Sequence, residues 1–171
     1  MKYLFLITIS LLMSTSTGNA QNAKAKTIKK TFSRETSVRI AIDAPSAIVW
    51  QLLTDAQDFP RWNSTIISLE GEIKKGQKIK IKSTLDEKRV FTLKVKEIIP
   101  QKQIIWGDSK GKRTYTLSQQ QDGGILFSMH EKIGGLAFPL YAKFIPPFDA
   151  NFEQFAQDLK REAEAQHQAA N

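Results

Sequence analysis

The C-terminal segment constrains the fold more than any other part of the sequence, because it carries one continuous aromatic stripe. Polar residues fill the positions between the apolar ones, which is the pattern of a single amphipathic helix. In a folded protein such a helix is stabilised mainly by covering its apolar face. We therefore expect the rest of the chain to supply an apolar surface of similar size. The residues that recur at helical spacing are Phe148, Phe152, Phe155, Leu159 and Ala163.

The middle of the chain supplies this surface as short segments in which apolar and polar residues alternate. Residues 78–82 read Lys-Ile-Lys-Ile-Lys, and residues 90–98 alternate in the same way. A period of two residues predicts half-buried β-strands, and tight turns between them predict antiparallel pairing. The predicted fold class is therefore α+β, with two short helices between residues 45 and 63. The other predicted strands are residues 36–42, 66–72, 104–106, 113–117 and 125–131.

The first twenty residues have the pattern of an export signal. Lys2 precedes an apolar run, Tyr3 to Met13, and Gly18 and Ala20 place small side chains where signal peptidase requires them. The run is shorter than the roughly 20 residues of a membrane span, so a retained anchor is the alternative. We expect a bacterial protein that is periplasmic or secreted after cleavage near Ala20.

Charge and composition narrow the choice of partners. The formal net charge is +8, and basic residues concentrate at residues 24–39 and 74–96. Because an exported protein seldom meets nucleic acid, we expect no nucleic-acid partner. We expect instead a weak contact of a basic face with an anionic membrane. A solvated basic face without a specific partner is the alternative. The chain has no Cys and two His, which excludes disulfides and thiolate metal sites, and we expect no metal and no cofactor.

Local motifs give the chain a resemblance to a known family over about residues 36–165. The segment Ile42–Trp50 resembles the strand-to-helix opening of the START/Bet v 1-like (SRPBCC) superfamily. Asp55 with FPRWN at residues 59–63 resembles its "D…FPxWN" motif, and Phe148–Glu164 is similar to its closing helix. Within the superfamily the chain is most similar to exported bacterial polyketide cyclase/dehydrase-like, lipid-transport members.

The resemblance implies a helix-grip fold, in which a curved antiparallel sheet of about seven strands wraps around a long C-terminal helix. Two short helices follow the first strand. Four segments result: a cleaved signal peptide at residues 1–20, a flexible basic arm at 21–35, a single helix-grip domain at 36–166 and a tail at 167–171.

The resemblance also implies a cavity between the sheet and the closing helix, with an apolar lining that would hold a hydrophobic ligand. The alternative is that the same side chains fill a solid core. The candidate ligand-binding residues are Trp62, Phe91, Trp106, Arg113, Tyr115, Phe127, Met129, Phe152, Phe155 and Leu159.

Three polar residues share strand faces that are otherwise apolar. Arg113 could hold a ligand carboxylate or phosphate. In an enzyme, Tyr115 could polarise a carbonyl, and Glu131 could act as a general acid or base if burial raised its pKa. The structural alternative is that Arg113 and Glu131 pair with each other or reach solvent.

Three functions remain open from the sequence. The favoured one is an exported carrier or sensor, with no catalytic residues, that binds a hydrophobic small molecule or lipid. The second is a cyclase or dehydratase that acts on a polyketide-like or aromatic compound through Glu131, Tyr115 and Arg113. The third is a basic protein that binds an anionic membrane surface. We expect a monomer in each case.

Overall fold

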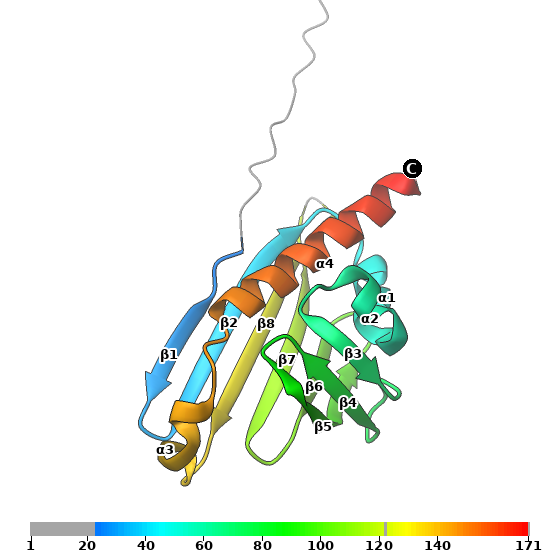
Figure 1. Cartoon of the computed structure of the whole chain (residues 1–171). Helices are drawn as coiled ribbons and strands as arrows, with labels where there is room; N and C mark the ends of the chain where they lie inside the picture. Colours follow the sequence, from blue (N-terminus) through cyan, green and yellow to red (C-terminus); the bar gives the residue numbers. More distant parts are fainter. Residues whose placement is uncertain (1–22, 122, 171) are drawn as a thin grey trace, which may run out of the picture.

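A computed structural model of the chain describes residues 23–121 and 123–170. The predicted signal peptide, residues 1–20, lies outside the described residues. A single antiparallel sheet of eight strands is ordered β1-β2-β8-β7-β6-β5-β4-β3, and the long helix α4 crosses one face of it (Figure 1). The strands are β1 Lys26–Lys30, β2 Ser33–Ile42, β3 Ile66–Glu70, β4 Lys78–Ser83, β5 Asp86–Ile99, β6 Gln103–Gly107, β7 Gly111–Gln119 and β8 Ile125–Gly134.

The helices lie in two groups along the sheet. The first group follows β2, and the second leads from β8 into α4 (Figure 1). In the described part of the chain, no helix is long and apolar enough to cross a membrane. The helical elements are α1 Ser46–Thr54, η1 Ala56–Asp58, α2 Phe59–Trp62, α3 Phe138–Tyr141, η2 Ala142–Phe144 and α4 Asp149–Ala169.

The aromatic stripe of α4 packs against the sheet as the sequence predicts. Phe152, Phe155 and Leu159 are each at most 1% exposed. The Phe155 ring lies 5.7 Å from the Tyr115 ring on β7 and 6.3 Å from the Phe127 ring on β8, between ring centroids. The sheet therefore supplies the apolar surface that the helix requires.

The helix is also tied to the segment after α2 by polar contacts. The Asp158 carboxylate is 1% exposed and accepts hydrogen bonds from the Ser64 backbone N–H at 2.8 Å and from its hydroxyl at 2.6 Å. Burial alone would raise the pKa of Asp158, but the hydrogen bonds from Ser64, Gln154 and Arg161 hold that pKa below its ordinary value. These contacts fix the position of α4 along its axis.

Two predicted segment boundaries differ from the structure. Residues 26–30 of the predicted flexible arm form β1, which pairs with β2 and makes eight strands rather than about seven. The sequence does not predict β1, because β1 is an exposed edge strand without apolar alternation. Thr27 Oγ1 donates a hydrogen bond of 3.1 Å to the Asp149 carboxylate and so holds β1 in place. The predicted tail is also shorter, since α4 continues to Ala169.

Candidate ligand-binding cavity

A cavity of about 550 Å³ lies toward one end of the sheet. One wall is the β4–β5 hairpin, the second is the β6–β7 hairpin with β8, and the third is the segment from Tyr141 to Phe148 that joins α3 to α4. The apolar residues in these walls are Ile81, Leu85, Phe91, Leu93, Trp106, Ile133, Tyr141, Phe144, Ile145, Pro146 and Phe148.

The β6–β7 hairpin shapes one side of the cavity by close backbone approach. A side-chain carbon added at Gly107 would lie 2.1 Å from the Gly111 carbonyl oxygen, so only glycine fits there. The Asp108 carboxylate accepts the backbone N–H groups of Lys110 and Gly111 at 2.7 and 2.9 Å, which is a turn that Asp favours. Lys110 and Lys112 consequently lie in the cavity wall.

Arg113 on β7 and Glu131 on β8 are cross-strand partners and form an ion pair in the cavity wall. The Arg113 Nε donates to Glu131 Oε2 at 2.5 Å, and Nη2 contacts the same oxygen. Their side chains are 12% and 16% exposed, and the guanidinium lies 4.9 Å from the centroid of the Phe152 ring. Burial is the largest influence and opposes the charge of Arg113, but the neighbouring Glu131 carboxylate and the Tyr115 hydroxyl favour that charge, and the pKa of Arg113 is raised. The observed ion pair therefore matches the alternative in which Arg113 and Glu131 bind each other rather than a ligand.

Tyr115 lies below the cavity wall, in the core. It is 1% exposed, and its hydroxyl has no hydrogen-bond partner among the described residues. Burial raises the pKa of Tyr115 to about 12, so the phenol is neutral at physiological pH. Tyr115 can pack against Trp106, whose ring centroid is 4.8 Å away, but it does not line the cavity.

The predicted ligand-binding residues fall into two groups. Phe91, Trp106 and Arg113 line the cavity, together with Glu131. The other seven were expected to line the cavity, but in the structure they lie in the packed core. The rings that face α4 pack on one another and leave the open space at one end of the sheet. These seven are Trp62, Tyr115, Phe127, Met129, Phe152, Phe155 and Leu159, and each is at most 2% exposed.

The third wall was absent from the candidate residues and comes from an apolar connection. The segment 136–147 contains Pro139, Pro146 and Pro147 and no Asp or Glu. Arg34 on β2 holds it, donating to the backbone oxygens of Ile145 at 3.1 Å and Pro146 at 2.7 Å. An apolar run with neither helical nor strand period was the one signal in the sequence that could have revealed this wall.

The chemistry that these walls allow is mainly apolar contact. Each of the three carboxylates in the walls is engaged: Glu131 with Arg113, Asp86 with Arg89 at 2.5 Å, and Asp108 with backbone N–H groups. A substrate that used one of these carboxylates as a proton acceptor would have to displace the partner it already has. Among the described residues, no His, Asp or Glu side chains gather as a metal-ligating group.

Solved structures with this arrangement include three informative ones. A conserved protein of unknown function from Enterococcus faecalis has a TM-score of 0.61 at 15% identity, over 84% of this chain and 78% of that one. A START superfamily protein from Mycobacterium smegmatis has a TM-score of 0.56 at 15% identity, over 80% and 99%. DynU16, from the dynemicin biosynthetic locus, has a TM-score of 0.58 at 16% identity, over 78% of this chain and 48% of DynU16. No curated protein matches the chain.

The eight-stranded sheet and the crossing helix form the helix-grip fold, which the START superfamily neighbour shares. The structure thus confirms the START/Bet v 1-like fold that the sequence motifs indicated. Residues 43–164 match the family model described as "Activator of Hsp90 ATPase homolog 1-like protein". The chain belongs to that family.

Proposed function

We propose that the protein is a carrier or sensor that binds a hydrophobic small molecule or lipid in the cavity beside Trp106. The observation that carries this proposal is an apolar cavity of about 550 Å³, a size typical of small-molecule sites. The engagement of its carboxylates supports binding rather than proton transfer. The walls come from three separate parts of the chain, so a ligand would contact the sheet and the segment before α4 together.

We also propose that the protein works outside the cytoplasm. The apolar run after Lys2 and the small residues Gly18 and Ala20 support export. Cleavage after Ala20 gives a chain that begins at Gln21, which the intact mass of the exported protein tests; a mass that includes Met1 would contradict export by this route.

A calorimetric titration with decanoic acid tests ligand binding. Burying the roughly nine apolar carbons of decanoic acid contributes about 7 kcal/mol, and association costs at least about 4 kcal/mol. The difference of about 3 kcal/mol predicts saturable binding with a Kd in the millimolar range. Leu93→Trp should weaken it at least about tenfold, because Leu93 lines the cavity and the larger ring would fill it.

Ile67→Trp is the matched control, since Ile67 is 39% exposed on β3 and is not in the cavity wall. The control should bind like the wild type, and both variants should keep a wild-type melting temperature within a few degrees. Equal affinities for the two tryptophan variants would place the ligand outside this cavity.

A cyclase- or dehydratase-type enzyme is the second candidate function. The observation that favours it is the position of Glu131 and Arg113 in the wall of an apolar cavity, together with the shared fold of DynU16. In that case Glu131→Gln would abolish turnover of an aromatic or polyketide-like compound. In a carrier the same variant keeps ligand binding, because the amide still fills its place beside Arg113.

A further inference from the structure

Four large apolar side chains are exposed at the end of the molecule where the third cavity wall lies. Exposed fractions are 54% for Phe32, 92% for Leu136, 78% for Leu140 and 69% for Phe144. We call these four residues the docking patch. Contiguous exposed apolar groups on a soluble domain indicate a surface that is covered by something else.

The patch is assembled from two parts of the chain. Phe32 lies in the turn between β1 and β2, and the other three residues lie in or beside α3 and η2. A hydrogen bond of 3.0 Å from the Gly135 N–H to the Phe32 carbonyl joins the two parts. Figure 1 shows α3 beside the β1–β2 turn, at the opposite end of the sheet from α1.

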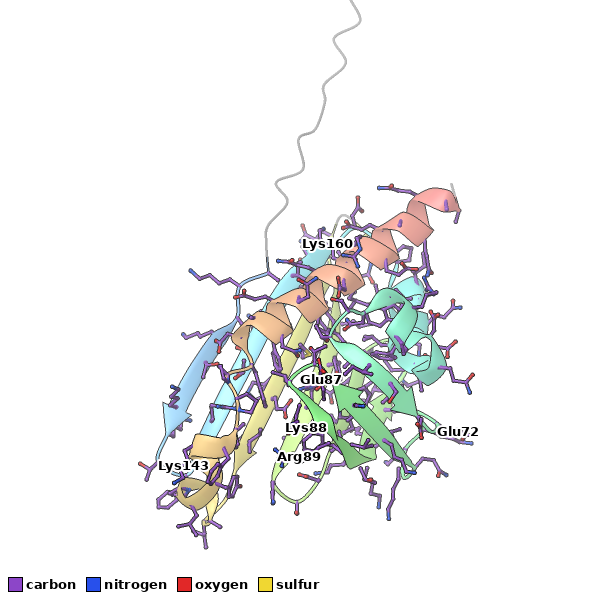
Figure 2. The ribbon with its side chains drawn as sticks, viewed as in Figure 1. Glu72, Glu87, Lys88, Arg89, Lys143 and Lys160 are labelled. Atoms are coloured by element: carbon purple, nitrogen blue, oxygen red, sulfur yellow. The ribbon has the colours of Figure 1, made fainter. Side chains whose placement is uncertain are left out.

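Two lysine ammonium groups lie beside the segment that carries most of the patch. The Lys143 ammonium lies 5.0 Å from the Phe144 ring centroid, and the Lys110 ammonium lies 5.4 Å from the Tyr141 ring centroid. Figure 2 shows Lys143 beside α3 at this end of the molecule. Because residues 136–147 contain no Asp or Glu, the segment combines apolar side chains with positive charge alone. That combination suits the interface of an anionic lipid bilayer.

The patch is the outer side of the segment that closes the cavity. Phe144 belongs to both, since it is 69% exposed and also lines the cavity wall. Tyr141 lines the cavity as well, and its hydroxyl donates to the Gly134 carbonyl at 3.3 Å. A bilayer that covers the patch would therefore lie next to the cavity.

We propose that the docking patch inserts into the surface of an anionic lipid bilayer and brings the cavity to it. A second copy of the chain fits the patch less well, because two-fold pairing would bring Lys143 and Lys110 near their own counterparts. The patch shares only Phe32 with the basic stretches expected from the sequence, residues 24–39 and 74–96, and its other three residues lie between 136 and 144. Docking requires no ligand in the cavity and can be tested separately from the proposed function.

Flotation with lipid vesicles tests the proposal. We expect the protein to float with vesicles of equal parts phosphatidylglycerol and phosphatidylcholine, and much less with phosphatidylcholine alone. Binding should fall as salt screens the lysines. The double variant Leu136→Glu, Leu140→Glu should lower the partition coefficient at least about tenfold, because it replaces inserting apolar groups with repelled charges.

Two controls locate the binding surface. Ile99→Glu changes an apolar residue that is 40% exposed at the end of β5, outside the patch, and should float like the wild type. Lys78→Glu with Lys80→Glu alters the basic face of β4 and should reduce binding less than the patch variant does. The patch variant should still bind decanoic acid in solution, because Leu136 and Leu140 do not line the cavity.

Three outcomes would overturn the proposal. The first is a wild-type protein that does not float with the anionic vesicles. The second is a patch variant that floats like the wild type. The third is loss of flotation in the Lys78, Lys80 variant while the patch variant keeps it, which would assign binding to β4. Absence of decanoic acid binding would count against the proposed function and leave docking standing.

Discussion

Phe155→Asp is expected to unfold the protein. Phe155 is 1% exposed, and its ring centroid lies 5.7 Å from that of Trp62, 5.7 Å from Tyr115 and 6.3 Å from Phe127. Truncating such a ring costs about 3–5 kcal/mol, and an unpaired carboxylate in its place adds to that cost. Domains of this kind are stable by only about 5–15 kcal/mol in total, so the variant should lose most or all of its folded population.

Circular dichroism in the near and far ultraviolet, with thermal melting, measures this loss. Ala165→Asp is the matched control, because Ala165 lies on the exposed side of the same helix. It should melt within a few degrees of the wild type. A cooperative melt of Phe155→Asp close to the wild-type temperature would mean that the aromatic face of α4 is not the core of the protein.

Arg113→Ala is expected to destabilise the protein by about 3–5 kcal/mol, the range found when one partner of a buried ion pair is removed. The variant leaves Glu131 mostly buried, with 16% of its side chain exposed, and without its cross-strand partner. It also removes the guanidinium that covers the Phe152 ring. Chemical denaturation at neutral pH measures the change in the free energy of unfolding.

The double variant Arg113→Met, Glu131→Leu separates the charge effect from packing. It removes both charges and keeps apolar volume, so we expect it to recover most of the lost stability. If the double variant were as unstable as Arg113→Ala, the pair would contribute to stability mainly through its shape. If Arg113→Ala were as stable as the wild type, the Glu131 carboxylate would reach solvent freely.

Much of the fold could be predicted because its elements carry their own periodicity. Phe152, Phe155 and Leu159 repeat at helical spacing, and Ile79 and Ile81 alternate with lysines on β4. The buried face of each element can therefore be predicted from its own residues. The edge strand β1 could not be predicted in this way. Its position comes from pairing with β2 and from distant contacts such as that of Thr27 with Asp149, which leave no local pattern.

The cavity was harder to predict than the fold, because its position depends on contacts between distant segments. The sequence identified Phe91, Trp106 and Arg113, which share strand faces with core residues. It did not reveal that the wall containing Tyr141 and Ile145 is held over the sheet by Arg34, more than a hundred positions earlier in the chain. Aromatic residues near the centre of α4 looked equally suitable, yet close ring packing removes them from the cavity.

The most direct test of the account is to map decanoic acid on the protein by nuclear magnetic resonance. We expect backbone amide shifts that saturate with ligand and cluster on β5 near Leu93, on β7 near Arg113 and on residues 141–148, the three walls of the cavity. The surface around Gln101, at the opposite end of β5, should remain unchanged. Shifts confined to that surface, or no saturable shifts at millimolar ligand, would contradict the claim that this cavity binds a hydrophobic molecule.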